Sequence, residues 1–258
     1  MLGQLVAAAT EDLARLKRER PGLVAEVASR PRRPRRFEAA LRSGTGFPLI
    51  CEVKQASPSA GIIRWTDPAA QARAYADGGA RCVSVLTEKR RFGGSLDHLR
   101  AVRAAVSLPL LRKDFIIDPH MIAEAVDAGA DAVLLLAGAV EPLRLAELWI
   151  SARELGLDVL LEVVQPFELA APDALAATLV GVNARDLETL EVDEARFGRL
   201  SPALRHADRL LVAESGIRTA EDIRRLAAAG AGAALVGESL MRATDPVAAA
   251  RELVEALA

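Results

Sequence analysis

The sequence CEVKQASPSAG at residues 51–61 follows the apolar run Pro48-Leu49-Ile50. This order predicts a short buried strand, a charged tip and then a loop rich in Pro, Ser and Gly. Because side chains alternate along a strand, Glu52 and Lys54 share one face. In a parallel barrel that face is the interior, where a buried acid and amine are costly unless they have a function. On an exposed edge strand the same pair would be an ordinary solvated ion pair.

From Pro48 onward the chain has eight such strands, each followed by a helical segment. Apolar, β-branched runs predict strands near 48–54, 82–87, 109–114, 131–136, 158–163, 178–182, 209–214 and 233–237. Segments rich in Ala, Arg, Glu and Leu predict helices near 67–78, 95–106, 119–129, 141–155, 166–176, 193–199, 219–229 and 246–257. Nearly continuous apolar strands joined by helices indicate a parallel sheet covered on both faces. Ser57-Pro58-Ser59 stands where a dinucleotide-binding fold would have glycines, so we expect a closed (β/α)8 TIM barrel of the α/β class.

Residues 1–46 have a different character and predict an N-terminal helical extension, so that the barrel domain spans 47–258. Leu5 to Arg20 has helical spacing, and Pro21 interrupts it. A basic connector at 31–36 precedes a short helix around Phe37–Leu41. The connector resembles a nucleic-acid or membrane patch in composition, but with acids upstream we interpret it as a solvated linker.

The overall composition restricts the class of protein. Lys and Arg number 33 against 35 Asp and Glu, a net charge of −2, which gives no field for binding nucleic acid. Cys51 and Cys82 lie in apolar strands and predict buried thiols in a reducing compartment. No stretch is apolar for long enough to be a signal peptide or a membrane span. We therefore expect a cytoplasmic protein that binds neither nucleic acid nor membrane, as a monomer or a weak homodimer.

Polar residues gather at the carboxyl ends of the predicted strands, where barrel enzymes hold their active sites. In chain order they include Glu52, Lys54, Ser57, Thr87, Glu88, Arg112, Lys113, Asp114, Glu162, Asn183, Arg185, Glu214, Ser215 and Glu238, and the apolar residues Phe92, Phe115, Leu134 and Leu136 fall at the same level. Only four of the 33 basic residues are lysine, and two of these, Lys54 and Lys113, fall at this level. Lysine can give up a proton when its pKa is lowered, whereas arginine cannot.

These residues indicate acid–base chemistry on a phosphorylated small molecule. Lys54 and Lys113, flanked by Glu52 and Glu162, can tune one another's pKa, although an ion-pair network that only closes the barrel would use the same residues. The glycines after the last two strands favour a phosphate cradle. Phe92 and Phe115 suit a flat apolar ligand. His98, His120 and His206 lie in predicted helices or outer loops, so no metal site is expected.

Seven segments together resemble the indole-3-glycerol phosphate synthase family of tryptophan biosynthesis. They are EVKQASPSAG (52–61), SVLTEKRRFGGS (84–95), LRKDFIID (111–118), LLEV (160–163), GVNARDLETL (181–190), AESGI (213–217) and LVGESLM (235–241). The resemblance runs in order from about residue 48 to the end and implies a ribulose-phosphate-binding type of barrel. It implies a carbon–carbon lyase that uses no cofactor. The substrate would be 1-(2-carboxyphenylamino)-1-deoxyribulose 5-phosphate, which is cyclised with loss of carbon dioxide and water.

The resemblance also implies roles for individual residues. Lys113 would protonate the C2 carbonyl, Glu162 would handle the proton for dehydration, and Lys54 would hold an anionic group and is an alternative acid. Glu52 and Asn183 would orient the amines and the developing hydroxyl. The remaining matched positions would bind substrate: Arg185 and Ser57 at its carboxylate, Phe92, Phe115 and Pro58 at its ring, Ser215, Gly216, Gly237 and Glu238 at its phosphate, and Leu134 and Leu235 in the apolar wall. Ser215 is also included in the catalytic set.

Two alternatives remain open at this point. One is a phosphoribosylanthranilate isomerase or another phosphosugar barrel, which would need a cysteine and aspartate pair, whereas Cys51 is expected to point away from the barrel interior. The other is a non-catalytic phosphate-binding barrel.

Three residues depart from the family pattern. The family often has basic residues at the positions of Gln55 and Ala60, and a small hydroxyl residue at the position of Glu238.

Overall fold

The computed structural model describes residues 1–31 and 34–257 of the chain. Its helices are α1 (Leu2–Glu19), α2 (Leu23–Ala28), α3 (Phe37–Leu41), α4 (Pro68–Asp77), α5 (Leu96–Ala105), α6 (Pro119–Asp127), α7 (Pro142–Glu154), η1 (Pro166–Glu168), α8 (Ala170–Ala174), α9 (Arg196–Leu204), α10 (Ala220–Ala228), α11 (Glu238–Arg242) and α12 (Pro246–Val254). Its strands are β1 (Leu49–Val53), β2 (Ala56–Ser57), β3 (Gly61–Ile62), β4 (Cys82–Leu86), β5 (Leu110–Lys113), β6 (Ala132–Leu136), β7 (Asp158–Val163), β8 (Leu179–Asn183), β9 (Leu210–Glu214) and β10 (Ala233–Val236).

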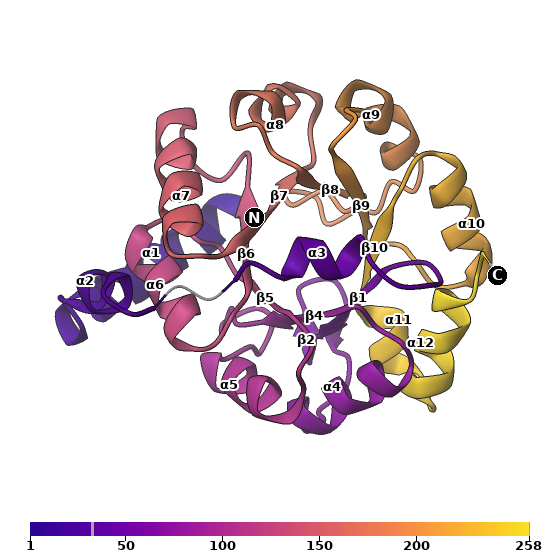
Figure 1. Cartoon of the computed structure of the whole chain (residues 1–258), viewed down its shortest axis with the longest axis horizontal. Coiled ribbons are helices and arrows are strands. Elements are labelled where there is room, and N and C mark those ends of the chain that lie inside the picture. Colours follow the sequence, from indigo (N-terminus) through magenta and orange to yellow (C-terminus); the bar gives the residue numbers. More distant parts are fainter. Residues whose placement is uncertain (32–33, 258) are drawn as a thin grey trace.

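Eight parallel strands close into a barrel in the order β1-β10-β9-β8-β7-β6-β5-β4. The helices that follow them form an outer ring (Figure 1). The predicted (β/α)8 barrel is therefore confirmed. Polar caps fix where several helices begin: the side chains of Asp67, Ser95, Asp118, Thr219 and Asp245 each accept a first-turn N–H.

The strand register stacks apolar residues below polar ones inside the barrel. Leu134 pairs with Leu160 across β6 and β7, and one step nearer the carboxyl end Leu136 pairs with Glu162. Asn183 pairs with Glu214 at the end of β8 and β9. The apolar layer closes the barrel beneath and leaves the polar layer facing the mouth.

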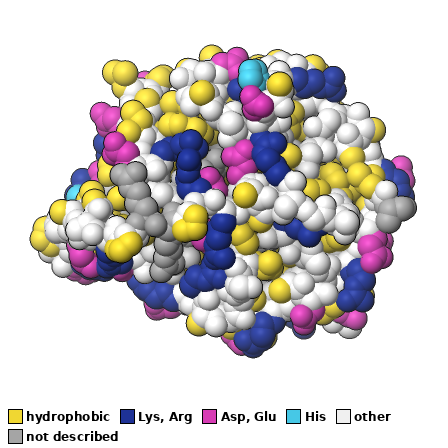
Figure 2. Space-filling view, in the orientation of Figure 1, with side chains coloured by type: hydrophobic (Ala, Val, Ile, Leu, Met, Phe, Trp, Pro, Cys, Tyr) yellow, Lys and Arg dark blue, Asp and Glu magenta, His cyan; other side chains and the backbone are white. Residues whose placement is uncertain are grey.

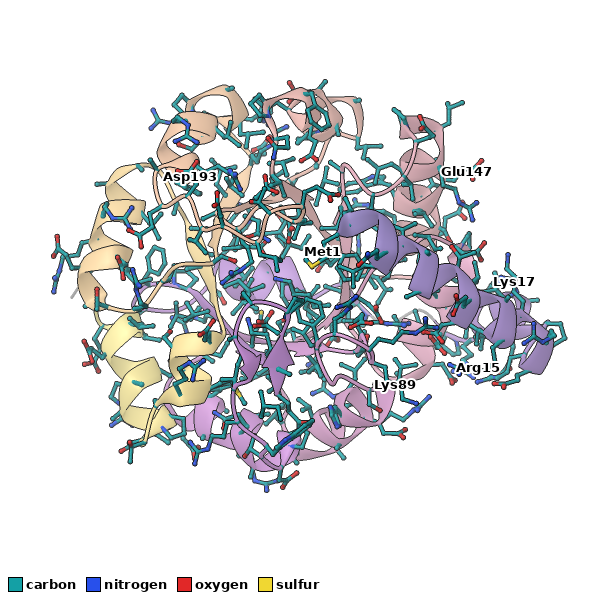
Figure 3. The ribbon with its side chains drawn as sticks, turned by 180° about the vertical axis from the view of Figure 1, so that it is seen from behind. Met1, Arg15, Lys17, Lys89, Glu147 and Asp193 are labelled. Carbon is teal, nitrogen blue, oxygen red and sulfur yellow. The ribbon has the colours of Figure 1, made fainter. Side chains whose placement is uncertain are left out.

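The N-terminal helices contact both ends of the barrel. α3 crosses the amino ends of the strands (Figure 1), where the carboxylate of Asp158 accepts the N–H groups of Phe37 and Glu38. α1 runs across the opposite face (Figure 3), and Lys17 there donates to Asp118 at 2.8 Å. Arg32 and Arg33 of the predicted connector lie outside the described residues.

Some elements differ from the sequence-based expectation. α2 and the small β2–β3 hairpin were not predicted. The single helix expected at 166–176 is divided into η1 and α8, and the Glu168 carboxylate accepts the N–H groups of Val164 and Gln165 where η1 begins. The helix expected at 193–199 begins only at Arg196, after a turn in which Asp193 accepts the N–H of Ala195.

The face that carries α3 has basic side chains interspersed with acidic and apolar ones (Figure 2). Among the described residues, no helix is both long and apolar enough to cross a bilayer.

Candidate active site

A cavity of about 360 Å³ opens at the carboxyl ends of the strands. Every site residue predicted from the sequence lines it: Glu52, Lys54, Ser57, Pro58, Phe92, Lys113, Phe115, Leu134, Glu162, Asn183, Arg185, Ser215, Gly216, Leu235, Gly237 and Glu238. The barrel therefore brings all of these residues to one place.

Glu52, Lys54, Lys113 and Glu162 line the floor of the cavity, and Glu214 is buried next to it and bonded to Lys113. We call these five residues the inner cluster. Lys54 Nζ lies 2.8 Å from Glu52 Oε1. Lys113 Nζ lies 3.5 Å from Glu52 Oε2 and donates to Glu214 Oε2 at 2.8 Å. The side chain of Glu214 is completely buried, and the two lysine side chains keep 17% and 15% exposure, enough for a ligand to reach them.

Burial and charge shift the pKa values of this cluster in different directions. For Glu52, burial opposes ionisation, but Lys54 and Lys113 outweigh it and lower the pKa. For Lys113, burial opposes the charge, but Glu214, Glu52 and Glu162 raise the pKa well above its usual value. For Glu162, burial and the neighbouring charge of Glu214 raise the pKa. The cluster therefore holds a firmly protonated amine beside an acid that favours its neutral form.

Glu162 has a different partner from the one its position suggested. From its position in the sequence Glu162 was expected to lie beside the lysines, whereas its Oε1 accepts a hydrogen bond from Asn183 Nδ2 at 2.9 Å. Asn183 Oδ1 in turn accepts the N–H of Arg185, which fixes the orientation of the amide. The direct partners of Lys113 are Glu214 and Glu52.

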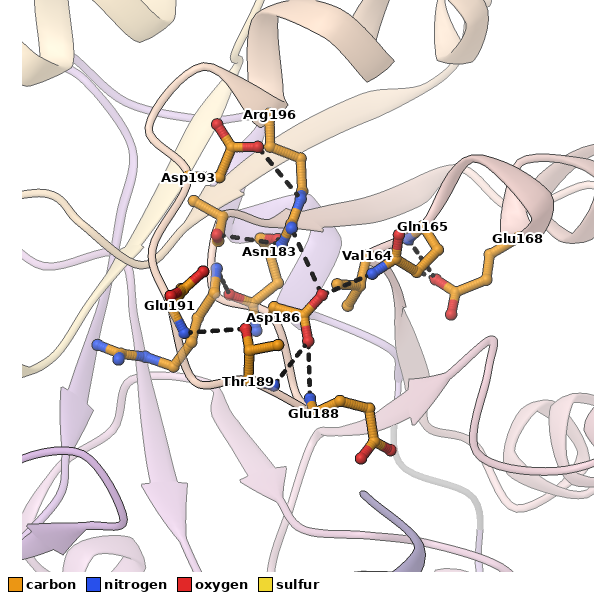
Figure 4. Close-up of polar contacts among 12 residues, drawn as sticks. Val164, Gln165, Glu168, Asn183, Asp186, Glu188, Thr189, Glu191, Asp193 and Arg196 are labelled. Carbon is orange, nitrogen blue, oxygen red and sulfur yellow. Dashed lines mark hydrogen bonds and ion pairs between the residues drawn. The ribbon is translucent and has the colours of Figure 1, made fainter. Parts of the chain in front are cut away.

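The loop after β8 is held by a dense set of polar contacts (Figure 4). The Asp186 carboxylate accepts the N–H groups of Glu188 and Thr189 and the side-chain amide of Gln165. Arg196 donates to the main-chain oxygens of Asn183 and Ala184. These contacts hold Asn183 in place, and Arg185 lines the cavity with its guanidinium bonded to the Leu190 carbonyl.

Two phenylalanines form the apolar wall that the sequence suggested. The rings of Phe92 and Phe115 have centroids 6.4 Å apart and planes inclined by 36°. Ser57 and Pro58, in the β2–β3 hairpin region, line the same cavity. This end of the cavity suits a flat aromatic group.

The other end of the cavity is built from the turns after β9 and β10. Ser215 and Gly216 both have a positive φ, at 68° and 76°, and the strained Ser215 is typical of a functional position. Arg218 and Arg242, which were not predicted, line this end and pair with Glu194 and Glu238. The Glu238 carboxylate, a departure from the family pattern, is thus held by Arg242 at 3.0 Å.

Several polar residues expected at the mouth point elsewhere. Arg112 alternates with Lys113 and faces outward, where it donates to Asp114, Thr87 and the Met121 carbonyl. Glu88 accepts three N–H groups of its own loop. Cys51 is fully buried, and burial raises the pKa of its thiol, so it is no nucleophile for this cavity.

Besides Arg218 and Arg242, two contributions to the site were not predicted from the sequence. Glu214 was noted at a strand end but not included among the site residues, although an acid closing an apolar strand is a signal of function. Leu5 of α1 also lines the cavity, and its signal was the buried stripe Leu5, Ala8, Ala9 and Leu16 at helical spacing. Among the described residues, no group of three His, Cys, Asp or Glu side chains is placed to hold a metal ion.

Comparisons with known proteins give a consistent result. Residues 2–253 match the family model described as indole-3-glycerol phosphate synthase. A relative of that name from Rhodopirellula baltica is 51% identical over 221 residues, which cover 85% of each chain. Another of the same name, from Leifsonia xyli subsp. xyli, is 48% identical over 254 residues and covers 98% of this chain and 97% of its own.

Solved structures of lower identity share the fold. A 3-hexulose-6-phosphate synthase matches with a TM-score of 0.63 and 20% identity, over 82% of this chain and all of that one. A thiamine phosphate pyrophosphorylase from Pyrococcus furiosus matches with a TM-score of 0.60 and 15% identity, over 81% of this chain and 94% of that one. These similarities show the barrel architecture alone.

Proposed function

The chain belongs to the indole-3-glycerol phosphate synthase family, and on this premise we propose the part that each side of the cavity plays in the family's reaction. The enzyme is a carboxy-lyase of tryptophan biosynthesis. It closes the indole ring of 1-(2-carboxyphenylamino)-1-deoxyribulose 5-phosphate, with loss of carbon dioxide and water. The observation that carries the proposal is Lys113, whose ammonium projects into a cavity that has an apolar wall at one end and strained turns at the other.

Lys113 is the general acid of ring closure. As the ring carbon bearing the carboxylate attacks the C2 carbonyl, negative charge develops on the carbonyl oxygen, and Lys113 donates a proton to it. Glu52 and Glu214 hold the ammonium on two sides and keep it charged before the substrate arrives. Loss of carbon dioxide then restores the aromatic ring.

Glu162 acts in the dehydration that follows. The hydroxyl formed at C2 must leave as water, which requires one proton delivered and one removed. Glu162 is buried and its pKa is raised above the usual value of a carboxyl group, so it can hold the proton that dehydration requires. Asn183 donates to its other oxygen and orients it, and Lys54 holds an anionic group of the substrate.

The two ends of the cavity orient the substrate. Phe92, Phe115 and Pro58 enclose the anthranilate ring, with Arg185 and Ser57 near its carboxylate. The main-chain N–H groups around Ser215, Gly216, Gly237 and Glu238 receive the phosphate, and Arg218 and Arg242 add positive charge there. Leu134 and Leu235 close the apolar floor.

The state of the cysteines favours a cytoplasmic enzyme. Its two cysteines are free and buried, as in proteins of a reducing compartment. An isomerase that uses a cysteine is disfavoured by the buried position of Cys51.

Turnover of the named substrate is the direct test. The purified chain is mixed with the carboxyphenylamino-deoxyribulose phosphate, without added cofactor or metal, and indole fluorescence is followed. We expect kcat on the order of 1 s⁻¹ within a few decades. A folded protein that binds indole-3-glycerol phosphate but never forms it would contradict the proposal and favour a non-catalytic barrel.

A further inference from the structure

The inner cluster carries one more acid than it carries bases. Glu52, Glu162 and Glu214 supply three carboxylates, whereas Lys54 and Lys113 supply two ammonium groups. Each of the three acids is at most 2% exposed. A surplus negative charge in so dry a place is costly, and a single bound proton removes it.

The hydrogen bonds show where this proton belongs. Glu52 and Glu214 each bond a lysine directly, whereas the partner of Glu162 is the neutral amide of Asn183. Two carboxylate oxygens of the cluster are buried without a partner, Glu162 Oε2 and Glu214 Oε1. These are the oxygens left over after Asn183 and Lys113 have bonded the others, so one proton between them would satisfy both.

A glycine explains how two acids on non-adjacent strands can meet. β8 lies between β7 and β9 in the barrel. At the level of Glu162 the register places Gly181 on β8, and Asn183 stands beside Glu214 one step higher. A Cβ on Gly181 would overlap Glu214 Oε1, so any larger residue would occupy the space that this oxygen fills.

We propose that Glu162 and Glu214 share one proton across the space left by Gly181, and that this pair sets the acidity of Lys113. The inference rests on the function proposed above. In the resting state the proton is bound covalently to Glu162 Oε2. This O–H group donates a hydrogen bond to Glu214 Oε1, while ionised Glu214 pairs with Lys113. The raised pKa of Glu162 agrees with this arrangement.

Transfer of the proton across this hydrogen bond changes two groups at once. One O–H bond breaks on Glu162 and one forms on Glu214, so no charge is gained or lost by the pair. Lys113 then loses its nearest counter-charge and becomes a stronger acid, and Glu162 becomes a carboxylate that can act as a base. One small movement thus prepares both proton transfers of the reaction.

Carboxyl ¹³C resonances of the full-length protein, labelled at the glutamate side-chain carboxyl carbon, test the proposal without needing turnover. The charged groups that face the pair are Lys113 from β5, Glu52 from β1 and Lys54 directly after it, and Arg185 lines the same cavity from the loop after β8. We expect one glutamate to remain protonated at pH 7 and its resonance to vanish in Glu162→Gln. In Glu214→Gln the pH at the midpoint of the Glu162 titration should fall by about one unit or more, because a like charge is removed.

Two further variants separate the pair from general effects. Gly181→Ala displaces the Glu214 carboxylate and should lower the midpoint of Glu162 in the same way. Glu194→Gln alters an exposed acid of the same cavity, which is paired with Arg218. This variant should leave the titration midpoint of Glu162 unchanged. The alkaline limb of kcat/KM should move to lower pH in Glu214→Gln and in Gly181→Ala, which a merely structural defect would not cause.

The contradicting results are definite. Full ionisation of Glu162 at pH 7 in the unaltered protein would overturn the proposal, as would a midpoint that stays in place in Glu214→Gln. Failure of the proposed function is distinguishable, because the substrate assay would then be silent while the titration still reported a shared proton.

Discussion

At the scale of single residues, the site depends on buried charges that neighbours compensate unequally. Lys113 has two carboxylates beside it, and Glu162 has only an amide. Their neighbours therefore give opposite outcomes, a lysine held charged and a glutamate that favours its neutral form. Acid–base catalysis needs such a difference, because groups with unlike proton affinities can give and take protons in turn.

Glu162 should lower the stability of the fold in return for its function. Its pKa is raised by folding, so its contribution to stability is present below the unfolded pKa and is lost as the pH rises through the folded pKa. We expect Glu162→Gln to raise the free energy of unfolding by about 1 kcal/mol or more at alkaline pH, and less toward pH 4. Urea unfolding across this range measures it. A gain in the free energy of unfolding that grows toward acid pH would contradict the account. The same variant should lose activity, with kcat reduced roughly 100- to 10,000-fold.

Gly237 should tolerate no side chain. A Cβ there would overlap Glu52 Oε1 and lie 3.1 Å from Lys54 Nζ, beneath the proposed phosphate seat. We expect Gly237→Ala to raise KM and lower kcat together, with kcat/KM reduced at least about tenfold. Gly198→Ala in α9 is the matched control, because nothing lies within 4 Å of its added methyl group. It should leave kcat unchanged and gain up to about 1 kcal/mol of stability.

Sequence periodicity was enough to predict that Glu52 and Lys54 share a face, since alternation along one strand is local. It could not predict that Lys113 bonds Glu214. β5 and β9 lie on opposite sides of the closed barrel, so their contact depends on closure and side-chain reach. The outward direction of Arg112 was available from the same alternation and was not used.

At the scale of elements, α1 turns an open barrel mouth into a covered cavity. Leu5 lines the cavity, and two ion pairs that differ in burial hold α1 on the barrel. Asp118 binds Lys17 and Arg144 and also caps α6. The pair between Glu11 and Arg90, at 2.6 Å, lies in solvent. The sequence predicted the helix but not its position, because its stripe could have packed on any apolar surface.

The two ion pairs should contribute differently to the stability of the fold. Asp118→Ala removes a helix cap and leaves Lys17 and Arg144 without their buried partner, so we expect a loss of about 2–4 kcal/mol. Glu11→Ala removes an acid that is 69% exposed and should cost less than about 1 kcal/mol. Urea denaturation of both variants measures the contrast, and equal losses would argue that burial does not decide it.

Folding lowers the pKa of Asp118, even though burial opposes this, because Lys17 and the His120 N–H favour the carboxylate. Its contribution to stability is therefore present above the unfolded pKa and is lost as the pH falls through the folded pKa. The difference between Asp118→Ala and the unaltered protein should shrink in acid.

At the scale of the whole molecule, one topology accounts for both the core and the site. Eight apolar strands fill the barrel below, and their carboxyl ends bring residues more than 180 positions apart in sequence, from Glu52 to Glu238, around one cavity. This much followed from the count of strand–helix units. The cover formed by α1 and the hairpin after β1 did not follow, because loops and extensions have no fixed place in the barrel pattern.

The role of Lys113 is the central claim, and kcat of Lys113→Ala on the carboxyphenylamino-deoxyribulose phosphate tests it most directly. Lys89→Ala, which removes an exposed lysine, is the control, with circular dichroism to check the fold of both. We predict that kcat falls at least about 100-fold in Lys113→Ala and stays unchanged in Lys89→Ala. A folded Lys113→Ala variant that turns over near the rate of the unaltered enzyme would contradict the account and transfer the acid role to Lys54.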